Sequence, residues 1–405
     1  MRVNTIGKLL MAVCLWLTAF GTGPGSSLIA AERQGPVNPA DPNRAEQTGA
    51  PEAVQFRLEV RSSPVATQIS SVPLAETRMS KAWAKRSEPN PPLDGNKVTE
   101  LLLPLSDTAL VVQSAEGEVR LALVSPDLLV ELGTGKQWTI GRSSWNWLRA
   151  QALELRVRHY GTLLDWKDAR NKLPRKSVFQ VTDLETGLSF RVQRRAGSQH
   201  ADVQPMTKAD TAIMKRIYGG QWSWKRRAIL VVTDEGDRLA ASMHGMPHGG
   251  DGIPGNNFSG HFCIHFRGST THKSDSVDMA HQLMAYKAAG RLVAYLESLE
   301  PYELAAALLE GLGQHDHAIV AAATPGLSPE DRKALDKQFD TVTAVKLDKW
   351  ERSDLSEGAL TEQVRQTALV SRKGSRSAKE TFSFTAARAS LDSPWRLIDI
   401  VKTPR

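Results

Sequence analysis

The chain has 405 residues, a net charge of +7, ten histidines and two cysteines. Both signs of charge are interspersed, so the excess is too mild for nucleic-acid binding and fits an anionic polymer or a membrane surface. The length suits two or three domains.

The N-terminus has the features of an export signal. Arg2 and Lys8 accompany an apolar run at 9–20, and small residues follow it. The run is shorter than the roughly 20 residues of a membrane-spanning helix. We predict a signal peptide at 1–31 and an extracytoplasmic protein, either secreted or associated with the cell wall or membrane surface. An uncleaved N-terminal anchor is the alternative.

Export changes the meaning of the cysteines. Cys14 lies inside the apolar run, so cleavage leaves Cys263 as the only thiol. A single thiol forms no internal disulfide. Cys263 is therefore a buried inert residue, a reactive nucleophile or a metal ligand.

The N-terminal part of the mature chain divides into two regions. Residues 32–97 are rich in proline and poor in apolar periodicity, which predicts a disordered linker in which FRLEVRSS favours one short strand. Residues 98–176 are predicted to form a small mixed α/β region. It comprises a hairpin around AEGE, then helices in SSWNWLRAQAL and DWKDARNKL.

Strands dominate the next region. Residues 177–300 are predicted to form a mainly-β domain with hairpins turning at LETG and DEGD, a helix after Thr207, and a long helix in SDSVDMAHQLMAYKAAGRLVAYLESL. Residues 301–405 are predicted to form an α+β accessory domain. There the helices PYELAAALLEGL and SPEDRKALDKQF precede several strands, an order that looks like the NTF2-like folds.

The segment GNNFSGHFCIHF at 255–266 places Cys263 between His261 and His265, and seven of the ten histidines lie between residues 200 and 281. In a strand these three side chains share one side, while the intervening apolar residues pack on the other. A neighbouring imidazolium lowers the pKa of a thiol and raises its nucleophilic fraction. We therefore predict an ionisable Cys263 that faces a cleft.

The residues MPHGG, followed by a glycine-bearing loop and GHFCIH, resemble the L,D-transpeptidase family of cell-wall enzymes over about residues 177–268. That family carries a His-Gly pair, a glycine-bearing loop and the signature Ser-His-Gly-Cys-Ile-Arg. The matching positions here are His248-Gly249 and Gly260-His261-Phe262-Cys263-Ile264-His265. The resemblance implies a multi-domain protein with a mainly-β catalytic domain, followed by helices and an α+β module.

The resemblance also implies roles. Cys263 would be the nucleophile, His248 the general base, and His261 would shape the pocket, while the Gly249 carbonyl would orient the base. The backbone N–H groups of Phe262 and Cys263 would stabilise the oxyanion. The implied reaction is acyl transfer on peptidoglycan stem peptides through a thioester, with an amine or water as acceptor and no cofactor.

Two departures concern the same segment. Phe262 replaces the family's glycine, and His265 replaces its arginine, which affects substrate positioning. His244, in MHGMPHG, is an alternative base, although the spacing from Cys263 favours His248.

Further side chains are predicted to contact substrate. His200 and Asp202 point the same way in an extended segment, although a surface histidine beside a turn-capping aspartate explains them as well. The full set comprises His265, His200, Asp202, the tryptophans Trp222 and Trp224 on one face of a strand, and Asn256 and Asn257 in the loop. Tryptophans at strand spacing are also typical of a core.

Two other functions fit the sequence. One is a zinc-dependent cell-wall peptidase that uses His200, Asp202 and loop histidines as ligands. The other is a non-catalytic wall-binding protein whose cysteine is inert. In each case the expected partner is peptidoglycan, not nucleic acid, with the N-terminal segment bringing the protein near a membrane.

Overall fold

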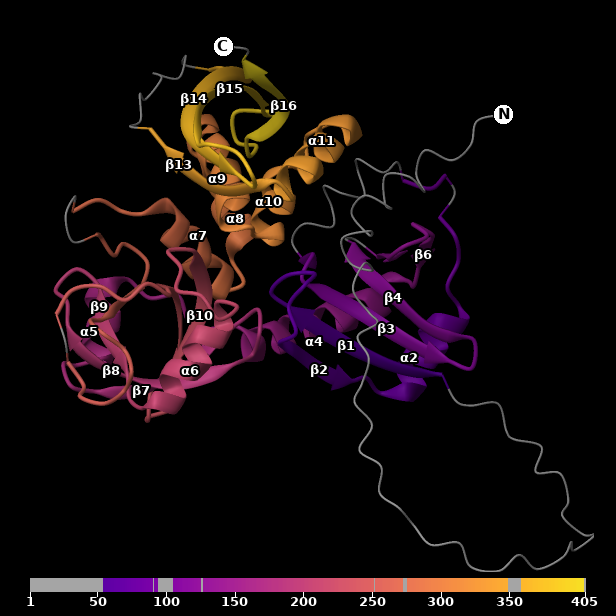
Figure 1. The fold of residues 1–405 in the computed structure, drawn as a ribbon. Helices are drawn as coiled ribbons and strands as arrows, with labels where there is room; N and C mark the ends of the chain where they lie inside the picture. The colour runs from indigo at the N-terminus through magenta and orange to yellow at the C-terminus, as the bar shows by residue number, and fades with distance from the viewer. Residues whose placement is uncertain are drawn as a thin grey trace, which may run out of the picture.

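The computed structural model describes residues 54–89, 91–93, 105–124, 127–250, 252–271, 275–348 and 358–403. The predicted signal peptide and residues 32–53 of the predicted linker lie outside this part of the chain. The described residues form a multi-domain protein in which strands predominate over helices. Its parts are an N-terminal sheet with helices, a closed barrel, and a C-terminal helical and sheet module (Figure 1). None of its described helices is long and apolar enough to span a membrane.

The N-terminal part is a six-stranded sheet covered by the helices α2 (Glu76–Ala84) and α4 (Arg142–His159). The hairpin predicted around AEGE is confirmed as its third and fourth strands. In sheet order the strands are β2 (Ile69–Pro73), β1 (Gln55–Arg61), β3 (Thr108–Ser114), β4 (Gly117–Val124), β5 (Leu128–Glu131) and β6 (Gln137–Thr139).

The prediction of a disordered linker is wrong for residues 54–89. Strand β1 pairs with β2 on one side and β3 on the other, and its alternate residues Phe56, Leu58 and Val60 are buried. The short strand predicted in FRLEVRSS is confirmed as β1, but the sheet was not predicted because the partner strand β3 lies far along the chain, beyond the prolines. This sheet domain therefore begins before residue 98.

The barrel closes in the antiparallel order β10-β11-β12-β9-β8-β7, and both predicted hairpins are confirmed. Helix α6 (Lys208–Ile217) begins as predicted after Thr207, whose hydroxyl oxygen accepts from the Asp210 N–H at 3.1 Å. The strands are β7 (Val178–Asp183), β8 (Ser189–Ala196), β9 (Ala201–Pro205), β10 (Arg226–Val232), β11 (Arg238–His244) and β12 (Phe262–His265).

The predicted boundary at 176/177 is misplaced, because helix α5 (Trp166–Lys172) packs into the barrel core. The Trp166 ring stacks on Phe266 at a centroid distance of 5.8 Å, and its indole N–H donates to the Ser198 carbonyl at 2.6 Å. The barrel domain therefore begins before β7.

The alternation of β12 places Cys263 on the outer face of the barrel. Phe262 and Ile264 are fully buried in the barrel core, as predicted, whereas Cys263 lies opposite Asp202 of β9 and belongs to the other face. Helix α7 (Met279–Ala288) packs across β10, β11 and β12 and covers this outer face. The site lies between the outer barrel wall, α7 and the loop after β11.

The single long helix predicted after the cysteine segment is wrong. It is broken at Gly290, with φ +63°, where a Cβ atom would lie 2.4 Å from the Tyr160 ring. Glycine allows this close approach and the left-handed backbone. The first helix, α7, is capped by the Asp278 carboxylate, which accepts from the His281 N–H at 3.0 Å. The second is α8 (Leu292–Glu297).

The order of helices before strands predicted for the C-terminal module is confirmed. Helix α9 packs against an antiparallel sheet of order β13-β14-β15-β16. The remaining elements are α9 (Pro301–Gln314), α10 (His317–Ala323), α11 (Pro329–Phe339), β13 (Val342–Leu347), β14 (Thr361–Arg372), β15 (Ala378–Ala387) and β16 (Arg396–Thr403).

Candidate active site

Cys263 is buried among polar groups. Its side chain is 2% exposed, and its Sγ atom lies 3.4 Å from His248 Nε2 and 3.8 Å from Asp202 Oδ1. The sulfur is therefore neither sealed in hydrocarbon nor distant from the histidines, and the structure brings together three of the residues that the sequence singled out.

His248 comes from the loop after β11 and is held by its backbone and its ring. Its N–H and carbonyl exchange hydrogen bonds with those of His261, at 2.9 and 2.7 Å. Its Nδ1 lies 3.0 Å from the Met246 carbonyl oxygen. A carbonyl oxygen only accepts, so Nδ1 donates to it and Nε2 is the ring nitrogen that faces the thiol.

The predicted role of the Gly249 carbonyl is wrong, because the Met246 carbonyl orients His248 instead. Gly249 has φ +71°, and a Cβ atom there would lie 2.3 Å from Cε1 of His261. The glycine therefore lets the loop pass close to the His261 ring. That ring lies beside His248, with centroids 4.5 Å apart, and its Nε2 is 3.7 Å from Asp202 Oδ1. His261 thus lines the pocket, as the resemblance implies.

His200 and Asp202 point the same way, as predicted. His200 Nε2 lies 3.1 Å from Asp202 Oδ1, and His200 Nδ1 lies 2.7 Å from the Thr270 carbonyl oxygen. The Thr270 carbonyl oxygen only accepts, so His200 Nδ1 donates to it and Nε2 is the ring nitrogen that faces Asp202. The pair lies beside Cys263 and is not a surface feature.

Three imidazoles stack behind the thiol. The ring centroids of His200 and His265 are 4.4 Å apart, and those of His265 and His281 are 3.8 Å apart with nearly parallel planes. His281 was not predicted to belong to the site, yet its Nδ1 lies 2.8 Å from Ser242 Oγ. Eight of the ten residues of its helix are buried, and the many apolar residues of MAHQLMAYKA could have indicated a helix packed on most of its faces.

The alternative base His244 lies deeper than His248. Its ring centroid is 5.2 Å from that of His248, and its Nδ1 accepts from the Met246 N–H at 3.3 Å. Burial, and then the charge of Arg226, lower the pKa of His244 well below its ordinary value. The imidazole in contact with the thiol is that of His248, which favours it as the base.

The two predicted tryptophans separate. Neither lies on a strand, because β10 begins at Arg226. Trp222 packs edge-on against Phe258 at 5.3 Å, so it is a packing residue. Trp224 is 51% exposed, and its ring lies 4.8 Å from His244 and 5.5 Å from His248. Only Trp224 is placed to present an apolar ring beside the base.

The two loop asparagines also separate. The amide of Asn256 is buried, donates to the Pro205 carbonyl at 2.8 Å and accepts from the Phe258 N–H at 2.9 Å. Its predicted substrate contact is therefore wrong, because both ends of the amide stabilise the loop. Asn257 is exposed with φ +59°, a left-handed conformation that asparagine tolerates.

The predicted lowering of the thiol pKa is wrong for the resting protein. Burial, and then the charge of Asp202, raise the pKa of Cys263 well above its ordinary value. Burial also lowers the pKa of His244 and of His281, so these rings are neutral and supply no opposing charge. A neutral thiol must therefore lose its proton as it attacks, and His248 is the adjacent acceptor.

Asp202→Asn is expected to increase the alkylation rate of Cys263 by iodoacetamide at pH 7 by about 3- to 10-fold. Removing the carboxylate charge lowers the thiol pKa, and one pKa unit changes the thiolate fraction tenfold. The rate is measured by intact mass, and the pH–rate profile should move to lower pH. Asp234→Asn, on the exposed turn after β10, serves as the control. An unchanged or lower rate in Asp202→Asn would contradict this electrostatic assignment.

The same side chains could hold a metal ion. Three sets have ligand atoms within 4.8 Å of one another, and each set includes Cys263. They are His200, Cys263 and His265; His244, His248 and Cys263; and Asp202, His261 and Cys263. Thiolate, imidazole and carboxylate are all zinc ligands.

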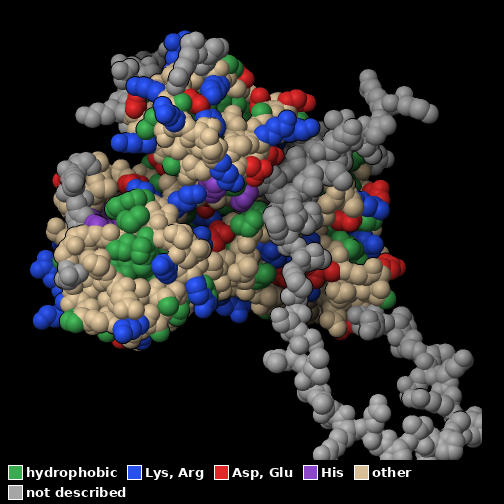
Figure 2. All heavy atoms as spheres, viewed as in Figure 1, with side chains coloured by type: hydrophobic (Ala, Val, Ile, Leu, Met, Phe, Trp, Pro, Cys, Tyr) green, Lys and Arg blue, Asp and Glu red, His purple; other side chains and the backbone are tan. Residues whose placement is uncertain are grey.

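Most of this histidine cluster is enclosed. His200, His244, His265 and His281 are buried, and only small patches of histidine surface are visible on the face in Figure 2.

Comparison with known proteins assigns no family to this chain, because no protein-family model and no curated protein matches it.

Proposed function

We propose that this chain is an exported, cysteine-dependent acyl transferase or peptidase that acts on peptidoglycan stem peptides through a thioester on Cys263. The observation that carries the proposal is the 3.4 Å contact between Cys263 Sγ and His248 Nε2, with His248 Nδ1 held by the Met246 carbonyl. The Cys263 nucleophile contacts the His248 base, and the Met246 carbonyl orients that base. This is the arrangement of nucleophilic catalysis.

The reaction uses a proton transfer within this pair. As Sγ attacks a peptide carbonyl carbon, His248 Nε2 takes the thiol proton and a tetrahedral oxyanion forms. When the C–N bond breaks, His248 returns the proton to the departing amine and Cys263 carries a thioester. An acceptor amine or water then attacks the thioester carbonyl and gives its proton to His248; as the C–S bond breaks, His248 returns that proton to the sulfur and the thiol is regenerated.

The raised pKa of the Cys263 thiol is compatible with this order of proton transfers. A thiol that stays protonated until substrate arrives needs a base within reach, and His248 Nε2 meets that need. The backbone N–H groups of Phe262 and Cys263 are our proposed oxyanion donors. Trp224, exposed beside the base, provides a flat apolar surface for a substrate.

The substrate class is supported by the sequence. The His-Gly and Gly-His-Phe-Cys-Ile-His segments resemble the L,D-transpeptidases, and the predicted export would bring the chain to the wall. The mainly-β barrel that carries both segments is consistent with an L,D-transpeptidase-like catalytic domain. By the order of its elements, the C-terminal module is proposed to be NTF2-like, with a scaffolding or partner-binding role.

Trapping the acyl-enzyme tests the proposal. The protein is incubated with a stem tetrapeptide without an acceptor amine, quenched in acid and analysed by intact mass and peptide mapping. We expect a peptidyl adduct, lacking the leaving group, on Cys263 of the wild type, and no adduct in Cys263→Ala.

Two outcomes would overturn the proposal. Peptide turnover that persists in Cys263→Ala and is abolished by a chelator would indicate the zinc peptidase. Absence of both turnover and adduct, together with sedimentation of the protein with purified peptidoglycan, would indicate the wall-binding protein.

A further inference from the structure

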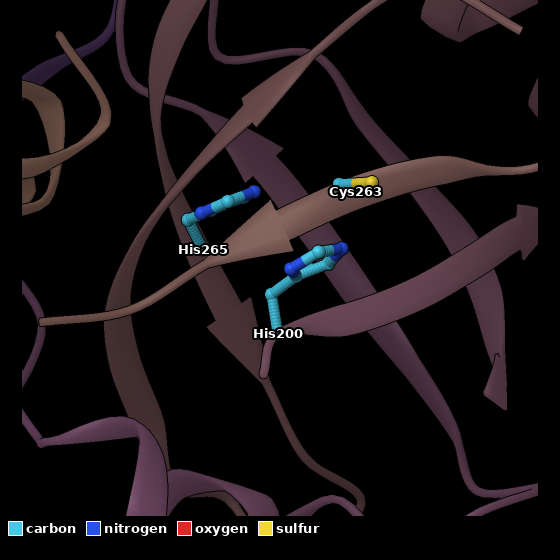
Figure 3. A group of neighbouring side chains, drawn as sticks. All are labelled: His200, Cys263 and His265. Atoms are coloured by element: carbon cyan, nitrogen blue, oxygen red, sulfur yellow. The ribbon is translucent and has the colours of Figure 1, made fainter. Parts of the chain in front are cut away.

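The Cys263 thiol and the imidazoles of two histidines form a cluster of possible metal ligands. Cys263 and His265 are on β12, and His200 immediately precedes the neighbouring strand β9 (Figure 3). All three are at most 2% exposed, and their ligand atoms lie within 4.8 Å of one another. One sulfur and two imidazoles thus converge on a small buried volume.

The surroundings of His200 are those of a metal-binding histidine. Such a histidine usually donates its second ring N–H to a carbonyl or carboxylate, which fixes the orientation of the ligand nitrogen. His200 Nδ1 lies 2.7 Å from the Thr270 carbonyl oxygen, which leaves Nε2 directed toward Asp202.

The separations also suit one ion. Zinc binds sulfur at about 2.3 Å and nitrogen or oxygen at about 2.0–2.2 Å, so tetrahedral ligand atoms lie roughly 3.3–3.8 Å apart. Asp202 Oδ1 lies 3.1 Å from His200 Nε2 and 3.8 Å from Cys263 Sγ. The Asp202 carboxylate therefore lies beside two of the three donors.

We propose that Cys263, His200 and His265 bind a zinc ion, with the Asp202 carboxylate beside it, and that the bound ion keeps the nucleophile inactive. The inhibitory part of this inference rests on the function proposed above, whereas the binding part does not. One thiolate and two imidazoles favour zinc over magnesium or calcium, which prefer oxygen ligands.

The chemistry of binding balances in charge and in protons. The Zn–S bond replaces the S–H bond, and the released proton passes to His248 Nε2, 3.4 Å from the sulfur, and then to solvent. The thiolate and the Asp202 carboxylate together neutralise the two positive charges of the ion, which stabilises it in a buried pocket. While bound, the sulfur lone pair is engaged and cannot attack a carbonyl.

Metal binding to the full chain tests the site. The protein is reduced, stripped with a chelator and titrated with Co²⁺ and Zn²⁺, followed by thiolate-to-cobalt absorption and by metal analysis. We expect one zinc per chain, and cobalt absorption that is lost in Cys263→Ala. His200→Gln and His265→Gln should each weaken zinc by more than about 100-fold, beyond the usual loss from an outer-shell change. His159→Gln, a buried histidine of α4 that contacts Ser70, is the control and should keep wild-type affinity.

A second measurement uses only the wild type. Saturating zinc should slow the alkylation of Cys263 by at least about tenfold, because a coordinated sulfur is no longer a free nucleophile. Stoichiometric zinc without this protection, or zinc affinity unchanged in both glutamine variants, would overturn the site. If zinc binds as expected but the metal-free protein forms no acyl adduct, the proposed function fails and the metal site stands. If the adduct forms and no zinc binds, the reverse holds.

Discussion

Cys263→Ala is expected to abolish acyl transfer, and His248→Gln to lower kcat/KM by about 10²–10⁴-fold, the usual contribution of general acid–base catalysis. The glutamine amide preserves the size of the side chain but takes no proton at neutral pH. Burial raises the pKa of the Cys263 thiol, so without a base little of it is present as the reactive thiolate. The measurement is steady-state transfer of a stem peptide to an acceptor amine in metal-free buffer.

His244→Gln is the matched comparison for that result. Both histidines belong to the same segment and their rings are 5.2 Å apart, but it is His248 whose Nε2 contacts the sulfur. We expect His244→Gln to lose at most about tenfold, as befits a residue that packs behind the base. A larger loss in His244→Gln than in His248→Gln would exchange their roles and contradict the assignment drawn from the Met246 hydrogen bond.

The predictions that succeeded depended on contacts between residues close in the chain. The hairpins at LETG and DEGD and the Thr207 cap each involve partners within a few residues, so the sequence pattern contains the whole interaction. The same holds for the alternation of Phe262 and Ile264 into the core, which placed Cys263 on the opposite face. Strand β1 was predicted in FRLEVRSS, but its place in a six-stranded sheet was missed because its partner β3 is distant in the chain.

The sequence predicted most of the residues that form the site, but it did not predict the direction in which the thiol pKa is shifted. His200, Asp202, His248 and Cys263 do converge, since the motif and the two-residue spacings specify strand faces. The thiol pKa depends on how deeply α7 and the loop bury the pocket, which no local pattern expresses. The orientation of His248 likewise depends on the loop path, which brings the Met246 carbonyl and not that of Gly249 to the ring.

Lys287→Met is expected to destabilise the protein by about 3–5 kcal/mol. The substitution removes a buried ammonium group and leaves the two carboxylates that pair with it without their positive partner. Lys287 is 3% exposed, and its Nζ lies 2.5 Å from Glu185 of the β7–β8 turn and 2.6 Å from Asp316, the N-cap of α10. Burial lowers the pKa of Lys287, but the two carboxylates outweigh it and the pKa is raised. The measurement is the midpoint of urea unfolding.

The contribution of this ion pair to the stability of the fold depends on pH through Glu185. Burial raises its pKa, but Lys287 outweighs this and the pKa is lowered below the ordinary value. The stabilisation is therefore complete above the unfolded-state pKa of Glu185, about 4.3, and is lost as the pH falls through the lower pKa of Glu185 in the folded protein. The difference in stability between wild type and Lys287→Met should narrow over the same range of acid pH.

Lys172→Met is the matched control, because Lys172 pairs with Asp237 at 2.7 Å on the surface, where both side chains are more than one third exposed. Solvent screens such a pair, and its loss should cost at most about 1 kcal/mol. Equal losses in the two variants would show that the buried lysine does not join the barrel turn to α10. A loss confined to Lys287→Met would show that one ammonium group, on the helix that covers the site, couples the barrel to the C-terminal module.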